Sequence, residues 1–224
     1  MSAGYGTAAL GRSLSKRERV ALVDAAYDAG IRWFDTAPLY GAGAAEDALG
    51  ISLRTKDDVV VATKVGIVSP RLIGVAFRRP AAGGRFAAAD IRTQLEGSLR
   101  RLRRDSVDVV LLHEVDADAA VTALDALDEL RREGKLLRIG IATGAAHAAA
   151  ILTVRLPDVV QLPAHKVVDP RGAQLVLHSA LAGRSGATSA RDLLRAVAEA
   201  HSGAVVLVGS RDAGHIREAA AALG

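Results

Sequence analysis

Short apolar runs rich in valine and isoleucine alternate along the chain with longer segments in which apolar residues recur at every third or fourth position. The short runs are typical of strands that are apolar on both faces, as in a parallel sheet covered by helices. The longer segments are typical of amphipathic helices. Eight strands with helices between them favour an α/β fold, the closed (β/α)8 TIM barrel, formed as a single domain by residues 1–224, over an open doubly wound sheet.

The expected elements follow from where each apolar run starts and stops. Strands are expected over residues 6–10, 31–35, 59–63, 107–113, 137–142, 159–162, 175–178 and 205–208. Helices are expected over 16–29, after Asp90 as an N-cap and in the segment closed by Gly134, and around 147–154, 191–200 and 215–223.

Two connections are irregular. The segment 65–89 is long and contains glycine, proline and several arginines, so we expect it to form a wall of the active site. The segment 163–174 is too short, and too broken by Pro170 and Gly172, for a full helix. The sequence therefore predicts a barrel whose sixth helix is reduced or lost, leaving the outer wall thin there.

Composition excludes several classes of function. The chain has no cysteine, which rules out disulfides and thiolate chemistry, and its six histidines include no His-x-His pair, so no metal site is expected. The net charge is +4, but aromatic residues make up only 3%, which argues against a nucleic-acid partner. No apolar run approaches the roughly 20 residues of a membrane span and no signal sequence opens the chain, so we expect a cytoplasmic protein without a membrane partner.

Four polar side chains stand at or just beyond expected strand ends: Asp35, Tyr40, Lys64 and His113. In a barrel of this kind, chemistry is carried by residues at the carboxyl ends of the strands. A phenol becomes a useful acid near neutral pH when a cation such as Lys64 favours its ionised form, and a buried lysine needs a carboxylate partner such as Asp35. His113 can donate a hydrogen bond to a substrate oxygen on which negative charge develops.

Four segments resemble the aldo-keto reductase family. They are residues 34–41 (FDTAPLYG) with Glu46 and residues 49–50 (LG) behind them, residues 60–64 (VVATK), residues 108–113 (DVVLLH) and residues 134–140 (GKLLRIG). The sequence of residues 112–116 (LHEVD) is similar to that of the family branch that oxidises sugars such as fucose and galactose. The resemblance implies that NADPH, preferred over NADH, gives hydride to an aldehyde, a ketone or a sugar-like carbonyl. It also implies that Tyr40 donates the proton, tuned by Lys64 and Asp35, and that His113 orients the carbonyl.

The resemblance also implies a set of cofactor-binding residues. These are Thr7, Thr143, Gln161, His178, Ser179, Leu181, Gly209, Ser210, Arg211 and His215. Several depart from the family pattern, because Thr143 replaces an asparagine, His178 replaces a stacking aromatic residue and His215 replaces an arginine. The long segment that straps over the pyrophosphate after the seventh strand is also nearly absent, since residues 184–188 lead directly into the next helix.

Two alternatives remain open at the level of sequence. A barrel with the same tyrosine, lysine, aspartate and histidine but no cofactor could act as a dehydratase, lyase or isomerase on a carbonyl compound. A non-catalytic relative could use the fold to bind a ligand or partner. Trp33, on the same strand face as Asp35, is expected either to fill the core or to contact the substrate.

Overall fold

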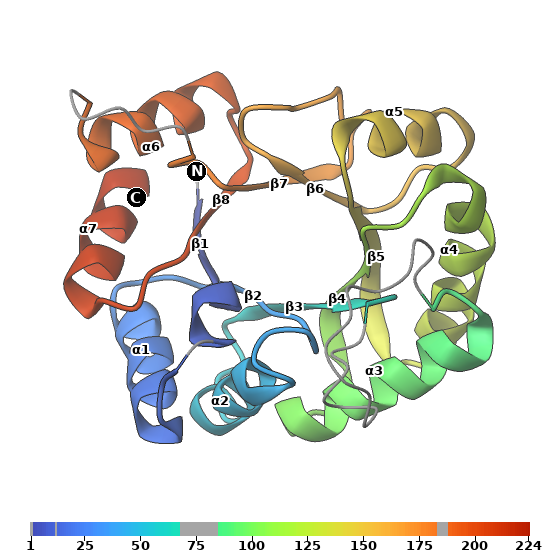
Figure 1. The fold of residues 1–224 in the computed structure, drawn as a ribbon, viewed down its shortest axis with the longest axis horizontal. Coiled ribbons are helices and arrows are strands. Elements are labelled where there is room, and N and C mark those ends of the chain that lie inside the picture. The colour runs from blue at the N-terminus through green and yellow to red at the C-terminus, as the bar shows by residue number, and fades with distance from the viewer. Residues whose placement is uncertain (1, 12, 68–84, 183–187) are drawn as a thin grey trace.

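The computed structural model describes residues 2–11, 13–67, 85–182 and 188–224, and these form a closed barrel of parallel strands in chain order (Figure 1). The strands are β1 (Ser2–Gly6), β2 (Trp33–Asp35), β3 (Val60–Val65), β4 (Val107–His113), β5 (Leu136–Ala142), β6 (Val159–Pro163), β7 (Gln174–His178) and β8 (Val205–Val208). The described helices are α1 (Lys16–Asp28), α2 (Ala44–Ser52), α3 (Ala88–Leu102), α4 (Ala117–Arg132), α5 (Ala145–Val154), α6 (Ala190–Ala200) and α7 (Ala213–Leu223). The predicted (β/α)8 barrel is thereby confirmed.

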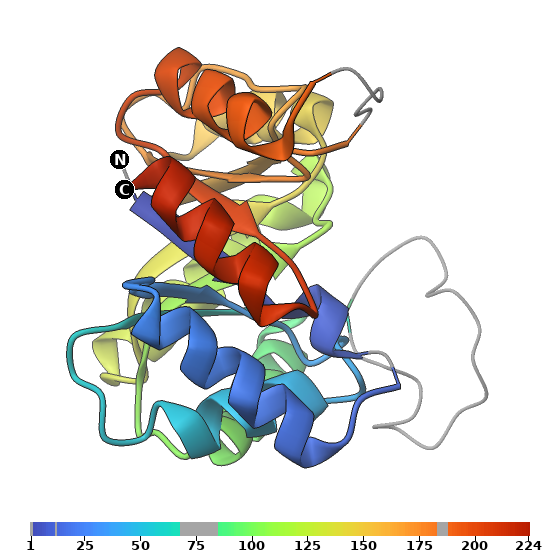
Figure 2. The same ribbon diagram turned by 90° about the vertical axis from the view of Figure 1, so that its left-hand side faces the viewer.

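Pairing of β1 with β8 closes the barrel, and α7 covers this seam from outside (Figure 2). The expected first strand over residues 6–10 was wrong. Strand β1 ends at Gly6, and Thr7–Gly11 forms a short 3-10 helix, η1. A Cβ atom on Gly4 would lie only 2.6 Å from Leu207 and 2.9 Å from Val205, so this strand needs a glycine that strand propensity disfavours.

The other expected strands lie within two residues of the observed ones, whereas two details of the helices differ. Helix α2 was not expected, because its short alanine-rich segment carries little apolar periodicity. Helix α3 begins after Ala87, with no side-chain cap, and Asp90 lies inside its first turn rather than capping it. Its carboxylate there still favours the helix dipole.

Apolar side chains form two layers, one inside the barrel and one between the strands and the helices. The inner layer is small and consists of Trp33, Ala62, Val109, Leu111, Ala142, Val159, Val176, Val205 and Leu207. The outer layer is larger and extends around the barrel beneath the helices. Because side chains alternate between the two layers along each strand, the strands are apolar on both faces, as the sequence predicted.

The sequence predicts that the helix between the sixth and seventh strands is lost, and this is confirmed within the described residues. Only turns and irregular backbone connect β6 to β7, and the helix labelled α6 follows β7. The wall is nevertheless closed. Val160 and Leu162 on the outer face of β6 are completely buried, and Val167 and Val168 of the connection pack against the outer layer. Residues 183–187 of the connection after β7 and residues 68–84 of the expected active-site wall lie outside the described ranges.

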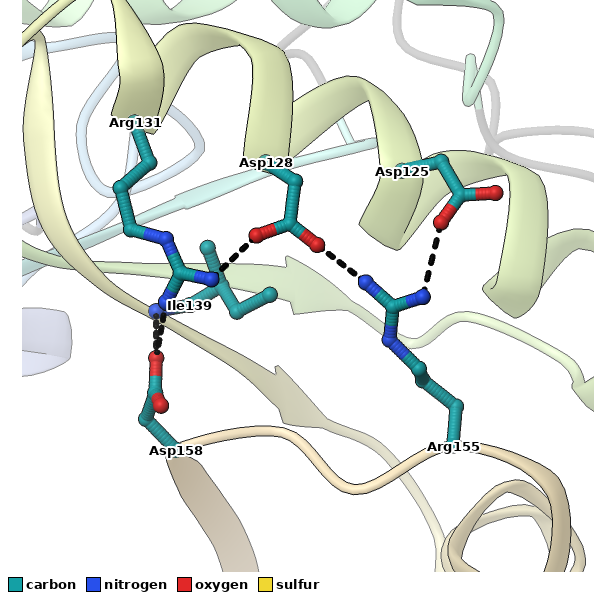
Figure 3. A network of polar contacts seen from close by, with 6 residues as sticks. All are labelled: Asp125, Asp128, Arg131, Ile139, Arg155 and Asp158. Atoms are coloured by element: carbon teal, nitrogen blue, oxygen red, sulfur yellow. Dashed lines mark hydrogen bonds and ion pairs between the residues drawn. The ribbon is translucent and has the colours of Figure 1, made fainter.

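Ion pairs join α4 to the segment that leads into β6 (Figure 3). The carboxylate of Asp128 accepts from both Arg131 and Arg155. Arg131 also donates to Asp158 at 2.9 Å, and Asp158 in turn accepts from the backbone nitrogen of Ile139 at 2.8 Å. The network therefore ties a helix, a loop and strand β5 together.

None of the helices in the described ranges is both long enough and apolar enough to cross a membrane.

Candidate active site

The predicted site residues continue the inward-facing rows of the strands beyond the inner apolar layer. Trp33 and Val159, for example, belong to that layer, and the next inward-facing residues on their strands are polar. The first inward-facing residues past the layer on β2, β3, β4, β6 and β7 are Asp35, Lys64, His113, Gln161 and His178. The parallel strands thus bring these side chains together at the carboxyl end of the barrel.

Both carboxylate oxygens of Asp35 accept hydrogen bonds. Lys64 Nζ donates to Asp35 Oδ1 at 2.6 Å, and Gln161 Nε2 donates to Asp35 Oδ2 at 3.0 Å. Lys64 Nζ also donates to the carbonyl oxygen of Thr36 at 3.1 Å. Both members of the ion pair are buried, with 2% of the lysine and 4% of the aspartate side chain exposed. The carboxylate therefore stabilises a cation that burial alone would disfavour.

Tyr40 reaches the same place from the turn after β2, where its backbone nitrogen donates to the carbonyl oxygen of Ala37 at 3.0 Å. Lys64 Nζ lies 5.3 Å from the centroid of the Tyr40 ring. The ring of His113 meets that of Tyr40 edge to face, with 6.3 Å between the centroids and 84° between the planes. The structure thus brings phenol, ammonium, carboxylate and imidazole together.

The environment sets the protonation of the phenol and the ammonium. Burial raises the pKa of Tyr40 above its ordinary value, and the nearby Lys64 ammonium offsets part of that rise. Burial would lower the pKa of Lys64, but its interactions with Asp35 and Tyr40 outweigh that effect and the pKa is raised. At neutral pH the pocket therefore holds a protonated phenol beside a charged ammonium.

His113 is neutral. Burial, assisted by the charges of Lys64 and His178, lowers the pKa of His113 to about 3. Its Nδ1 atom is buried without a hydrogen-bond partner among the described residues. A buried N–H without a partner is rarer than a buried acceptor without one, so the proton belongs on Nε2. The ring is therefore a neutral hydrogen-bond donor toward the pocket.

A pocket of about 720 Å³ opens above these groups and contains all four predicted catalytic side chains. Six of the residues predicted to bind a cofactor also line it: Gln161, His178, Ser179, Gly209, Ser210 and Arg211.

The other four predicted cofactor residues do not line the pocket. The buried Thr7 hydroxyl donates to the carbonyl oxygen of Asp35 at 3.0 Å, and the buried Thr143 hydroxyl donates to that of Val115 at 2.8 Å. Leu181 is 40% exposed. His215 is exposed in the first turn of α7.

One charged pocket residue, Glu114, was missed by the sequence reading. It directly follows His113 at the carboxyl end of β4, which is the signal that could have identified it. Trp33, in contrast, does not line the pocket. Its ring fills the barrel interior, with the Arg138 guanidinium carbon 5.2 Å from the ring centroid, so the expectation of substrate contact was wrong and that of core filling was right.

The lining suits a dinucleotide. The Asp35 carboxylate can only accept hydrogen bonds, so the Gln161 amide must turn its nitrogen toward it, which leaves Oε1 to accept from a ligand amide. A Cβ atom on Gly209 would lie 3.2 Å from the carbonyl oxygen of Gly6, so the glycine keeps this part of the pocket open. The planar Arg211 guanidinium at the pocket edge is suited to a phosphate. No group of three metal-ligating side chains occurs in the described part of the chain.

A sequence model described as the aldo/keto reductase family matches residues 3–174. The chain belongs to the aldo/keto reductase family. The D-threo-aldose 1-dehydrogenase of a Pseudomonas species is 37% identical over 170 residues, which cover 65% of this chain and 50% of that protein. This aldo/keto reductase therefore spans about half the length of that curated relative.

Solved structures of the family share the barrel. PA4992 from Pseudomonas aeruginosa, described as an aldo-keto reductase, is 26% identical, with a TM-score of 0.75 over 98% of this chain and 88% of that chain. An aldo/keto reductase from Klebsiella pneumoniae, in complex with NADP and acetate, is 22% identical, with a TM-score of 0.74 over 99% of this chain and 85% of that chain.

Proposed function

We propose that this protein is an NADP(H)-dependent oxidoreductase that interconverts an aldehyde or ketone and the corresponding alcohol, with Tyr40 as the proton donor. Membership of the aldo/keto reductase family supports the reaction class. The observation that carries the proposal is the Tyr40 phenol beside the buried pair of Lys64 and Asp35, inside a pocket large enough for a cofactor and a small substrate.

The chain supplies the proton. A bound NADPH would supply hydride to the carbonyl carbon. The Tyr40 hydroxyl then gives its proton to the carbonyl oxygen, which yields the alcohol and leaves a tyrosinate that takes a proton back from water. The Lys64 ammonium stabilises that tyrosinate, and Asp35 keeps the ammonium charged within the buried site.

His113 orients the carbonyl. Its neutral ring donates from Nε2 to the substrate oxygen, and the hydrogen bond strengthens as negative charge develops there. In the oxidative direction the tyrosinate form of Tyr40 takes the alcohol proton, and His113 holds the same oxygen. Both directions therefore use one set of groups.

The cofactor is assigned to the predicted residues that line the pocket. Gln161 Oε1 would accept from the carboxamide of the nicotinamide, and the His178 ring, with Ser179 beside it, would offer a stacking face. Gly209, Ser210 and Arg211 would hold phosphate groups. The extra phosphate of NADPH would give the Arg211 guanidinium an anionic partner that NADH lacks, which favours NADPH over NADH.

A titration with NADPH and with NADH tests the proposal, followed by the fluorescence of the reduced nicotinamide because Trp33 lies outside the pocket. We expect saturable binding of NADPH and oxidation of the bound nucleotide when a small aldehyde is added. Tyr40→Phe should retain the binding and lose the turnover by roughly 10²–10⁴-fold. Absence of binding by either nucleotide at millimolar concentration would remove the reductase, and turnover of a β-hydroxy carbonyl without nucleotide would point to a lyase instead.

A further inference from the structure

Glu114 has a strained backbone at the end of β4. Its φ angle is +54°, in the left-handed region that residues other than glycine and asparagine rarely adopt. Its backbone nitrogen donates to the carbonyl oxygen of Ala142 at 2.7 Å, which continues the β4–β5 ladder past His113. Such strain persists where the surrounding structure enforces it, and it concentrates at functional sites.

Glu114 lines the pocket together with Tyr40 and His113. Its residue is exposed, and within the described ranges its carboxylate has neither an ion-pair partner nor a hydrogen-bond donor. Asp35, in contrast, has both oxygens engaged by donors. Among the described residues Glu114 is thus a pocket carboxylate that no donor engages, and its charge acts on the reacting phenol, whose pKa it helps to raise.

The described lining mixes polar groups with small apolar side chains. The apolar residues are Ala8, Ala9, Ala142 and Leu207, and Tyr40 is the one Phe, Trp or Tyr side chain in that lining. Binding of a large apolar substrate draws on wide apolar and aromatic surface, which these residues do not provide. Within the described lining, recognition of a substrate therefore falls mainly to the polar groups near the reacting phenol.

We propose that Glu114 selects neutral, hydroxyl-bearing carbonyl substrates by accepting hydrogen bonds from hydroxyl groups close to the reacting carbonyl. This inference rests on the proposed reductase function. A carboxylate accepts two such hydrogen bonds at once, and the same charge repels a substrate that carries a carboxylate or phosphate. The Lys64 cation offers an anionic substrate little relief, because Asp35 already pairs with it.

Three small aldehydes separate hydroxyl recognition from charge: glyceraldehyde is neutral with hydroxyls, propanal is neutral without them, and glyoxylate is anionic. In Glu114→Gln we expect kcat/KM for glyceraldehyde to fall by about 10-fold or more, the value of hydrogen bonds to a charged group. Propanal should stay within about 2-fold, and kcat/KM for glyoxylate should rise several-fold once the like charge is removed.

Glu199→Gln is the matched control, because Glu199 is an exposed residue of α6 outside the pocket and the substitution removes the same charge. We expect it to leave all three aldehydes unchanged. Equal changes for the three aldehydes in Glu114→Gln, or no change in any of them, would overturn the selection by Glu114 while leaving the reductase intact. Unchanged thermal unfolding of the variant would show that the effect is local.

Ligand binding without turnover separates this inference from the proposed function. Saturation-transfer NMR with glycerol, 1-propanol and glycolate reports contact with the protein, whether or not any carbonyl is reduced. We expect the glycerol signal to weaken in Glu114→Gln and the glycolate signal to strengthen. If wild-type protein reduces no aldehyde, the proposed function fails, and equal glycerol signals from wild type and variant would still reject the role of Glu114.

Discussion

The Nζ atom of Lys64 lies 2.6 Å from Oδ1 of Asp35, and both side chains are almost completely excluded from solvent. Burying either charge alone would cost several kcal/mol. Together they hold a permanent cation within 5.3 Å of the centre of the Tyr40 ring. The pair therefore provides a buried cation beside the phenol.

Replacing the Lys64 cation should lower both the stability of the fold and the rate of turnover. In Lys64→Met the Asp35 carboxylate stays buried with only the Gln161 amide as a side-chain donor, so we expect a loss of about 3–5 kcal/mol in the free energy of unfolding. Turnover should fall by roughly 10²–10⁴-fold. Urea denaturation and steady-state kinetics measure the two effects. Adding Asp35→Asn should restore much of the stability without the activity, and a double variant as unstable as the sum of the single ones would contradict the pairing.

The state of Tyr40 predicts how the rate depends on pH. Because the pKa of Tyr40 is raised above its ordinary value of 10.0, the phenol keeps its proton through neutral pH and loses it only in strongly alkaline solution. Carbonyl reduction should therefore hold its rate through neutral pH and decline at alkaline pH. Alcohol oxidation, which needs the tyrosinate, should accelerate toward alkaline pH. Profiles of kcat in both directions measure this, and a reductive rate that declines below neutral pH would contradict the assignment of Tyr40 as donor.

Because His113 is neutral, we expect no histidine titration step in the pH profiles of the reaction. With its pKa at about 3, this ring should contribute no change in kcat/KM over roughly pH 5 to 8, where an ordinary histidine titrates. His113→Ala should lower kcat by about 10²–10³-fold, as for the loss of one donor to a developing oxyanion. His113→Gln retains an N–H donor and should recover part of that loss. Equal activity of the two variants would mean that His113 does not donate to the substrate.

The ion-pair network of α4 should stabilise the barrel without affecting the site. The Asp128 side chain is only 15% exposed and accepts from Arg131 and Arg155, so Asp128→Asn should cost about 1–2 kcal/mol after allowance for the exposure of the arginines. Asp125, which accepts from Arg155 but is 59% exposed, provides the matched comparison, and Asp125→Asn should cost below about 0.5 kcal/mol. Chemical denaturation at low and high salt measures both, and equal costs would show that burial does not decide the worth of these pairs.

Much of the site could be predicted because the alternation of side chains along a strand is a local pattern. Alternation along β3 and β4 places Lys64 and His113 in the inward rows of their strands, and each row becomes polar where the strand ends. Glu114 escaped prediction because its position depends on a left-handed turn, which nothing in its own residue type favours. Asp90 was mistaken for a cap because residue type alone does not say where a helix begins.

By itself the sequence determined the barrel, the absence of a helix between β6 and β7 and the polar positions at the strand ends, since these follow from the spacing of apolar and polar residues. Only the tertiary structure decided that Gly4 lies in a strand, because the need for a glycine there comes from side chains of β8. It also decided that the pKa of Tyr40 is raised, because burial outweighs the nearby Lys64 cation. Burial and the distance to a charge depend on residues far apart in the chain, and no local pattern contains them.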